Sequence, residues 1–518
     1  MTERQIAGPE AVEQQEPTPG GVASLRPRLL KSTPGIVAGC WLLIAVCLMF
    51  STPPGASPDE AAHYIRALGV GRGQVVLDDV PPKPPAPQFP VQIAWMQEQS
   101  GVVRAPERLA PIAFECWAFP FYVGTCWESD PPTSDRTVTF ETYVGTYPPA
   151  AYVLPGLLMR ATDDPTTALM LGRAGILLVS LLLLGLAVFA LYDGRTPRSL
   201  AAVLLSVSPM VLAMAAALTS SGVEIAAAIC FMACLLRLTR CGPPGWVWFS
   251  AAFSGATLAV ARDLGPAWVL LELGLAAVFI GFRPLRAIWR SGGRRARIFA
   301  AVIGVAMGAA LVWRAVEAAQ PDLSQIRFGG LTSGEAGGLV RQVVGVFGPL
   351  DALMPETAYR VWGAMVLVVV VTGFIGGNRW QRLSLGLAIA ATVVMAILLE
   401  AVQNIYDFGV QARHILPAAV CITMIAGETV ARAERPRWLS SRFLMPVLSA
   451  AAAAIHLTAW HTIGRRFSKE NAPIVFFTDP AWAPPGGWVV WGVLMAAACG
   501  AIVLPFLAAF SNSHRAAD

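Results

Sequence analysis

The sequence predicts an all-α protein that crosses a membrane about twelve times. Of its 518 residues, 55% are apolar and only 14% are charged, whereas soluble domains carry roughly 25% charged residues. The mean hydropathy is +0.57. The apolar residues also come in blocks of about 18 to 22, the length that an α-helix needs to cross a hydrocarbon core of roughly 30 Å. These observations indicate a multi-pass protein in contact with the lipid bilayer, and we expect that membrane to be the plasma membrane.

Each apolar block is expected to form one transmembrane helix, with boundaries that are accurate to a few residues. The expected spans lie near residues 34–51, 171–192, 199–218, 222–239, 246–261, 265–282, 298–316, 360–377, 383–402, 412–430, 443–461 and 487–510. The unequal loops between these spans divide the chain into segments. The expected segments are a disordered cytoplasmic tail (1–33), an N-terminal transmembrane module (34–316) with its outer loop (52–170), a second outer loop (317–359), C-terminal transmembrane helices (360–510) and a cytoplasmic tail (511–518). Short surface helices are expected over 150–161 and 336–347.

Basic residues indicate on which side of the membrane each connection lies. Short cytoplasmic loops accumulate Lys and Arg, and every second connection of this chain is basic, with six arginines between Arg283 and Arg297. A cytoplasmic N-terminus places all of these connections and the C-terminus in the cytoplasm. The large loops then face outward. Cys116 and Cys126 lie in the first outer loop, where an oxidising compartment favours a disulfide between them; the alternative is two free thiols.

The first outer loop opens with a candidate catalytic residue. Ser57 followed by Glu60 has the spacing of a capping box, with Pro58 at the first helical position, so a helix is expected to begin here. That box would occupy Glu60 and leave Asp59 without a structural role. His63 lies four residues further on, on the same helical face. The helix dipole alone favours Asp in a first turn, so it is the junction with the membrane that makes Asp59 a candidate.

These residues carry a resemblance to a known class of enzymes. The large outer loop after the first span, opening with Asp59-Glu60, resembles that of the glycosyltransferase-C superfamily, including protein O-mannosyltransferases and lipid A aminoarabinose transferases. More specifically, the chain resembles a bacterial polytopic family catalogued as a domain of unknown function. The strings that carry this resemblance are Pro-Asp-Glu-Ala-Ala-His (58–63), Tyr147-Pro148-Pro149, Phe-Gly-Pro-Leu-Asp-Ala-Leu-Met-Pro (347–355) and Gln-Ala-Arg-His-Ile-Leu-Pro (411–417). Pro349 and His414 depart from the family pattern, which has an aromatic residue and Tyr there.

The resemblance implies a glycosyltransferase-C-like fold and a transfer reaction. Such enzymes take a monosaccharide from a polyprenyl-phosphate donor at the outer membrane face and usually invert its anomeric carbon. An acidic residue of the first outer loop serves as general base, which makes Asp59 the expected catalytic residue. In some members a divalent cation (Mg or Mn) binds the lipid phosphate. The acceptor would be an envelope polysaccharide, glycolipid or protein, and the transferred sugar an arabinofuranosyl or mannosyl group.

Residues at the outer ends of the spans are candidates for binding the donor. Arginine matches phosphate oxygens with paired hydrogen bonds, and Arg413 is the first candidate, with snorkelling to lipid headgroups as the alternative. Arg262 is the second, while Asp263 is expected to cap the helix that starts near 265. Trp95 and the aromatic residues over 117–127 are expected to stack on the acceptor, to form a small loop core or to form a belt at the membrane interface. The other candidate substrate-binding residues are Glu60, His63, Tyr147, Gln411 and His414.

Two acidic residues lie within the expected spans. Glu224 follows Ser221 with capping-box spacing, which assigns it a structural role. Glu272 lies near the middle of the 265–282 span, where an unpaired charge is costly. It favours the competing function, a transporter or flippase of lipid-linked sugars, for which internal repeats and interrupted helices are expected; no convincing repeat is found. A noncatalytic scaffold is the third class. The sequence has no nucleotide-binding, zinc-binding or nucleic-acid signature.

Overall fold

The computed structural model confirms an all-α polytopic membrane protein. It describes the chain except for residues 1–20, 82–89, 112–132, 193, 195–196, 241, 318–323, 325, 327–330, 434–440, 470–471 and 516–518. Cys116, Cys126 and the aromatic residues over 117–127 lie outside the described residues, so their predicted roles stay predictions.

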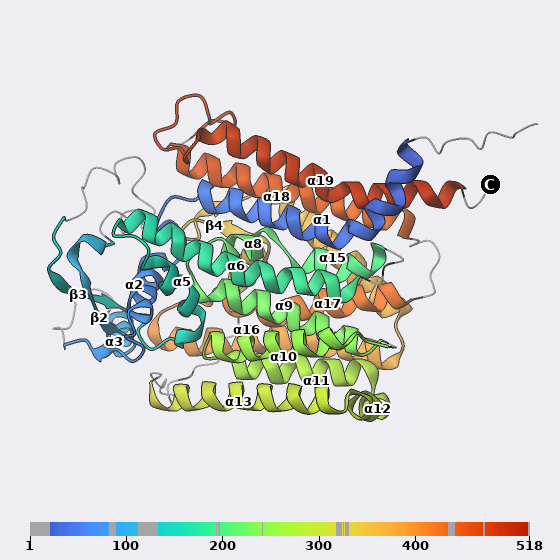
Figure 1. Ribbon diagram of the computed structural model, residues 1–518, viewed down its shortest axis with the longest axis horizontal. Helices are drawn as coiled ribbons and strands as arrows, with labels where there is room; N and C mark the ends of the chain where they lie inside the picture. Colours follow the sequence, from blue (N-terminus) through green and yellow to red (C-terminus); the bar gives the residue numbers. More distant parts are fainter. Residues whose placement is uncertain are drawn as a thin grey trace, which may run out of the picture.

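Long helices run side by side along one axis and form the body of the molecule (Figure 1). They are α1 (Gly21–Ser51), α6 (Pro165–Leu191), α9 (Ser220–Leu238), α10 (Gly245–Ala261), α11 (Gly265–Ile280), α13 (Arg294–Val316), α15 (Glu356–Gly376), α16 (Arg379–Gln403), α17 (Leu416–Arg432), α18 (Ser441–Ser468) and α19 (Gly487–Arg515). The first and last helices extend past the predicted span boundaries. Residues 21–33 and 511–515, expected in polar tails, are helical.

The expected count of twelve membrane crossings is not confirmed. Within the described ranges, eight helices are long and apolar enough to cross a membrane, or up to ten if each of two bent helix pairs counts as one span. The expected span 199–218 is one of these pairs: after the 3-10 segment η4 (Pro197–Leu200), α7 (Ala201–Ser206) and α8 (Pro209–Ala215) meet at 64°. Pro209 lacks an N–H and disfavours helical backbone at the preceding residue, so the helix breaks here.

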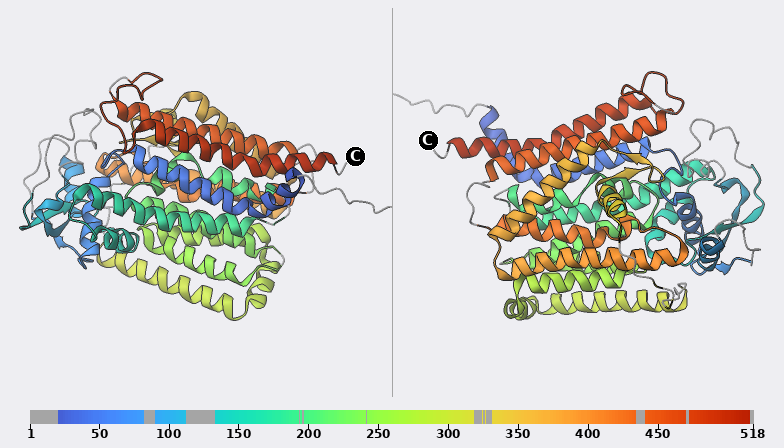
Figure 2. Two further views of the ribbon diagram at one scale, coloured as in Figure 1. Left: turned by 45° about the horizontal axis from the view of Figure 1, so that its top comes forward. Right: turned by 180° about the vertical axis from the view of Figure 1, so that it is seen from behind.

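The loop after α1 forms a compact module at one end of the bundle, which both views of Figure 2 place beyond the long helices. The sequence did not predict the module's three-stranded antiparallel sheet in the order β1-β2-β3, in which Val103 pairs with Phe140. The elements of the module are α2 (Glu60–Gly71), β1 (Asp78–Asp79), α3 (Pro90–Glu98), β2 (Gly101–Pro106), η1 (Glu107–Leu109), β3 (Thr137–Thr142), η3 (Pro149–Tyr152) and α5 (Val153–Met159). The last two confirm the short helix expected over 150–161.

Two glycines allow helices α2 and α5 of the module to approach each other closely. A Cβ on Gly156 of α5 would lie 2.4 Å from the carbonyl oxygen of Ala67, and one on Gly71 of α2 would lie 2.1 Å from the oxygen of Gly156. Backbones can meet this closely only where neither residue carries a side chain. The contact holds α2 against α5, and it fixes where the start of α2, with Asp59, faces the bundle.

The remaining elements lie at the two ends of the bundle. In the second loop, α14 (Ser333–Val344) confirms the expected helix, and β4 (Val346–Phe347) pairs with β5 (Ala352–Leu353). The 3-10 segments η6 (Asn404–Tyr406) and η7 (Ala412–His414) join α16 to α17. At the opposite end, α12 (Phe282–Gly292) lies far from the module, as does the C-terminus (Figure 1). The arginine-rich connection 283–297 is therefore separated from the first loop by the length of the bundle.

Candidate functional site

A cavity of about 380 Å³ lies between the module and the adjoining ends of the bundle helices. Its lining comes from segments that are far apart in the sequence: the start of α2, the turn between α10 and α11, and η7 with the residues before it. The charged and polar lining residues include Asp59, Gln99, Tyr143, Tyr147, Glu224, Arg262, Asp263, Arg314, Gln403, Gln411, Arg413 and His414. Six of the eight predicted site residues thus line one cavity, and Glu60 and His63 do not.

Asp59 has an unusual backbone conformation. It is the N-cap of α2, with φ 59° and ψ 13°, and its side chain caps no backbone N–H. Residues other than glycine rarely adopt this left-handed region, although Asp tolerates it better than most. The predicted capping box of Ser57 and Glu60 is therefore wrong, because the helix begins two residues later than expected. Freed from capping, the Asp59 carboxylate faces the cavity.

Glu60 has a structural role in a buried ion pair. The guanidinium of Arg173 donates to its carboxylate from Nε at 2.8 Å and from Nη2 at 2.6 Å, and both side chains are fully buried. The backbone N–H groups of Gly55 and Leu218 donate to the same carboxylate. A buried ion pair is stable when all of its polar atoms have partners. The expected contact between Glu60 and substrate is not supported, since Glu60 instead fixes α2 to α6.

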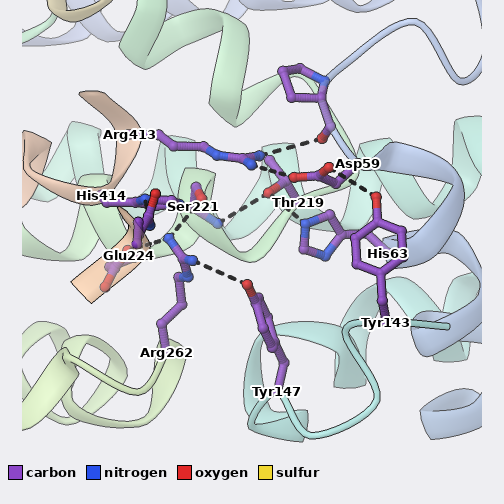
Figure 3. Close-up of polar contacts among 12 residues, drawn as sticks. Asp59, His63, Tyr143, Tyr147, Thr219, Ser221, Glu224, Arg262, Arg413 and His414 are labelled. Atoms are coloured by element: carbon purple, nitrogen blue, oxygen red, sulfur yellow. Dashed lines mark hydrogen bonds and ion pairs between the residues drawn. The ribbon is translucent and has the colours of Figure 1, made fainter. Parts of the chain in front are cut away.

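Two neighbours hold the Asp59 carboxylate (Figure 3). Arg413 of η7 forms an ion pair with its Oδ2 and reaches the carbonyl of Pro58 at 3.5 Å, and Tyr143 donates to its Oδ1 at 2.9 Å. Burial favours the protonated acid, but the neighbouring groups, with Arg413 first among them, together outweigh burial and hold the pKa of Asp59 below its usual range. Asp59 is therefore an ionised carboxylate at neutral pH.

His63 lies behind Asp59. Its Nδ1 is 2.7 Å from the hydroxyl of Tyr152 and its Nε2 is 3.2 Å from the hydroxyl of Thr219. Burial chiefly lowers the pKa of His63 to about 3, so the imidazole is neutral at pH 7. The position of His63 does not support the expected substrate contact. It joins α2 to η3 and to the start of α9 and thereby supports the cavity wall.

Arg262 is the second guanidinium of the cavity. Its Nη2 is 3.4 Å from the Tyr147 hydroxyl and its Nη1 is 3.4 Å from Oε2 of Glu224, while the guanidinium carbon lies 5.4 Å from the centre of the Tyr147 ring. Burial opposes the charge, but Tyr147 and Glu224 outweigh burial and raise the pKa of Arg262. Arg262 follows the last residue of α10 in extended conformation, which directs its side chain across the end of the bundle.

The structural roles predicted for Glu224 and Asp263 are wrong. Thr219, not Ser221, is the N-cap of α9, and Glu224 accepts from Arg262 and, at 3.1 Å, from the indole N–H of Trp268. Asp263 does not cap α11; one of its carboxylate oxygens is buried without a hydrogen-bond partner in the described residues, and burial raises its pKa. Both acids instead line the cavity.

Gln411 and His414 complete the lining near Arg413. The side-chain oxygen of Gln411 is buried with no partner in the part of the chain that the structure describes. His414 Nδ1 lies 2.9 Å from the side-chain amide nitrogen of Gln403. Burial lowers the pKa of His414 well below its usual value. Trp95 stacks on Tyr406 with ring centres 4.0 Å apart, which gives the cavity an aromatic wall. Among the described residues, no three His, Cys, Asp or Glu side chains gather as a metal site.

Sequence reasoning missed Tyr143 and Arg314. Tyr143 lies just before the Tyr147-Pro148-Pro149 string, but the sequence gives no sign that β3 directs it toward Asp59. Arg314 carried a usable signal. It lies near the end of the 298–316 span on the same side as the first outer loop, where a positive residue is uncommon.

Comparisons with known proteins give one family and two solved structures. A family model described as "Predicted membrane protein (DUF2142)" matches residues 42–422. No curated protein sequence matches the chain. The fold is similar to ArnT from Cupriavidus metallidurans in the apo state, with 14% identity, 86% of this chain and 74% of that chain covered, and a TM-score of 0.37. For ArnT from the same organism bound to undecaprenyl phosphate, the identity is 13%, the coverage 81% and 75%, and the TM-score 0.38.

Proposed function

The chain belongs to the DUF2142 family of predicted membrane proteins, and we propose that it is a membrane glycosyltransferase of the glycosyltransferase-C type. In this proposal it moves a monosaccharide from a polyprenyl-phosphate donor to a cell-envelope acceptor, with inversion at the anomeric carbon. The observation that carries the proposal is the cavity in which an ionised Asp59 lies beside the guanidinium groups of Arg413 and Arg262. A base and positive charges for a departing phosphate are the two requirements of this chemistry.

Asp59 is the proposed general base. An acceptor hydroxyl attacks the anomeric carbon, its proton passes to the Asp59 carboxylate, and the bond from the anomeric carbon to the phosphate oxygen breaks. The pair with Arg413 makes Asp59 a weak base before the donor binds. When the lipid phosphate competes for Arg413, the carboxylate loses part of that stabilisation and becomes more basic. Donor binding thus prepares the base for its step.

Arg262 and Arg413 are the proposed phosphate ligands. The negative charge on the phosphate grows as the sugar leaves, and a guanidinium can meet two phosphate oxygens with parallel hydrogen bonds. The guanidinium of Arg262 lies over the ring of Tyr147, which holds it at the cavity wall. The stacked rings of Trp95 and Tyr406 offer an apolar face for a sugar ring.

The cavity is proposed to open on the extracytoplasmic face. The described parts of the loops that the charge pattern places outside lie at the same end as the module, and the arginine-rich α12 lies at the other end (Figure 1). Cytoplasmic connections are the basic ones. Both termini would then be cytoplasmic, and the donor would reach the cavity from the outer leaflet. The proposed sugar is arabinofuranose or mannose.

The test uses the purified full-length protein with decaprenyl-phosphate arabinose and decaprenyl-phosphate mannose, each with cell-envelope extract as acceptor. Transfer of labelled sugar by the wild type and its loss in Asp59→Asn, by about 100-fold or more, are expected for removal of a general base. Asp78→Asn is the matched control: it makes the same chemical change in an exposed pair with Arg104, in the same loop. Near-normal transfer by a folded Asp59→Asn protein would remove Asp59 from the mechanism.

A lipid-linked sugar transporter is the second candidate, and Glu272 favours it. Both carboxylate oxygens of Glu272 are buried in α11 without a partner among the described residues, and α7 and α8 form a pair bent by 64°, as in a broken span or a re-entrant loop. Intramembrane carboxylates and broken helices are typical of transporters. Movement of lipid-linked sugar across proteoliposome membranes that Glu272→Gln abolishes and Asp59→Asn leaves intact, with no transfer product from any donor, would favour this candidate.

A further inference from the structure

The end of the bundle opposite Asp59 holds a second cavity with different chemistry. It has a volume of about 510 Å³ and lies between α9, α10, α11 and α12. Most of its lining is apolar, and its charged lining residues are Arg286 and Arg290 of α12. The apolar residues around it include Leu235, Leu238, Trp248, Leu273, Ala276 and Phe299. An apolar cavity with a cationic edge fits a molecule that has a hydrocarbon part and an anionic group.

The orientation of α12 places this cavity at a membrane surface. At Gly281, with φ 83°, the chain turns by 112° from α11 into α12, which Figure 1 shows nearly end-on. Leu285 and Trp289 lie four residues apart on α12, and their side chains are 40% and 48% exposed. A short helix that lies across the spans with exposed apolar residues and arginines is typical of the membrane interface.

The chain segment that contains α12 carries charges of one sign. Residues 273–316 contain no Asp or Glu, and six arginines lie between residues 283 and 297. Neither Arg286 nor Arg290 has a hydrogen bond or an ion pair with any residue in the described ranges, and both are exposed. Their charges are therefore available to an anion from outside the chain.

We propose that the cavity binds an anionic phospholipid of the bilayer. Its phosphate would lie on Arg286 and Arg290, and one acyl chain would lie between α9 and α11 against Leu235 and Leu273. A lipid fits better than a free anion, because a free anion would leave an apolar volume of this size unfilled. This inference is independent of the transfer reaction proposed for the other end.

The test measures lipid binding to the full-length protein in detergent by native mass spectrometry. The probes are phosphatidylglycerol, phosphatidylcholine with the same acyl chains, and inorganic phosphate. Phosphatidylglycerol is expected to bind most tightly, and Arg286→Gln/Arg290→Gln is expected to weaken its binding about tenfold or more, as the loss of charge-assisted phosphate contacts predicts. Arg294→Gln/Arg297→Gln is the matched control, since it removes the same charge from residues that do not line the cavity.

A second variant tests the acyl-chain part of the site. Ala276 is nearly buried in the cavity wall, so Ala276→Phe fills the cavity without changing charge and is expected to weaken phosphatidylglycerol binding. Three outcomes would overturn the proposal: equal binding of phosphatidylcholine, equal losses in the two double variants, or displacement of the lipid by inorganic phosphate at similar concentrations. The melting temperature of each variant is measured as well, and a value equal to that of the wild type would show that a loss of binding is not a loss of fold.

Discussion

The guanidinium of Arg413 forms an ion pair with the carboxylate of Asp59, although 354 positions separate the two residues in the chain. Asp59 belongs to the module after the first span and Arg413 to the entrance of α17. The pair therefore joins the two halves of the molecule at the cavity. Arg413 is nearly buried, while the Asp59 side chain is one-third exposed toward the cavity, so an incoming ligand meets the carboxylate from one side.

Arg413→Gln is expected to move the acidic limb of the pH profile of kcat/KM upward. In the wild type, burial raises the pKa of Asp59, but Arg413 and its other neighbours together hold it below its ordinary value of 3.8, with Arg413 contributing most. Without Arg413, burial remains and raises that pKa. Because the base must be ionised, the variant loses activity at a pH where the wild type is still active. The measurement is the rate of sugar transfer between about pH 4 and pH 8.

The same pair has a consequence for stability. A carboxyl group whose pKa is lower in the folded than in the unfolded state stabilises the fold above its unfolded pKa, and this contribution disappears as the pH falls through the folded value.

For the pH profile of Arg413→Gln, the control variant is Arg341→Gln, because it breaks an exposed pair with Glu356 that does not line the cavity. An acidic limb that stays in place in Arg413→Gln would mean that some group other than Asp59 controls it.

Tyr143→Phe is expected to reduce kcat about tenfold with little change in fold stability, since it removes one hydrogen bond to a charged group. The Tyr143 hydroxyl donates to Oδ1 of Asp59 at 2.9 Å and so orients the carboxylate. Tyr64→Phe is the matched control: its hydroxyl donates to the carbonyl of Leu109 at 3.1 Å, away from the cavity. We expect this control to lower the melting temperature but to keep kcat. Equal kcat values in the wild type and Tyr143→Phe would contradict the orienting role.

The helical spans could be predicted because each needs only a local apolar block of sufficient length. The break between α7 and α8 also had a local signal in Pro209, but a helix that continues past a proline gives the same pattern. The sheet of the module could not be predicted, since β2 and β3 pair residues that lie more than thirty positions apart. Such pairings depend on tertiary contacts that the alternation of single residues does not encode.

In the site, too, contacts between residues far apart in the chain could not be predicted from the local sequence. Asp59, Arg262 and Arg413 could be predicted from their residue types and their positions at the ends of spans. Glu224 was assigned to a capping box because Ser221 has the right spacing, but helix α9 begins at Ser220, so the local pattern gave the wrong partner. Glu60 was misassigned for the same reason: its partner, Arg173, lies 113 positions away. Capping motifs compete with distant ion pairs, and the stronger electrostatic partner prevails in a buried site.

Arg173→Met is expected to destabilise the fold by about 3–5 kcal/mol, because it leaves the buried Glu60 carboxylate without its counter-charge. Melting of the detergent-solubilised protein measures the effect. Glu60→Gln/Arg173→Met should recover part of the loss, since no buried charge remains. Recovery is incomplete, because Arg173 also donates to the carbonyls of Met49, Thr52 and Pro53. A double variant less stable than Arg173→Met would show that the ion pair is not the main source of the stability lost in Arg173→Met.

Arg262 and Glu224 should have opposite effects on the donor KM. Arg262→Gln removes a guanidinium from the cavity and is expected to raise the KM about tenfold or more, as the loss of a charge-assisted bond to phosphate predicts. Glu224→Gln leaves Arg262 in place but removes the carboxylate that shares its charge at 3.4 Å, so the phosphate meets a stronger field and the KM should fall. Initial rates at varied donor concentration measure both values. Because both variants break the same ion pair, a purely structural role would change the KM in the same direction in each, and that result would remove Arg262 from phosphate binding.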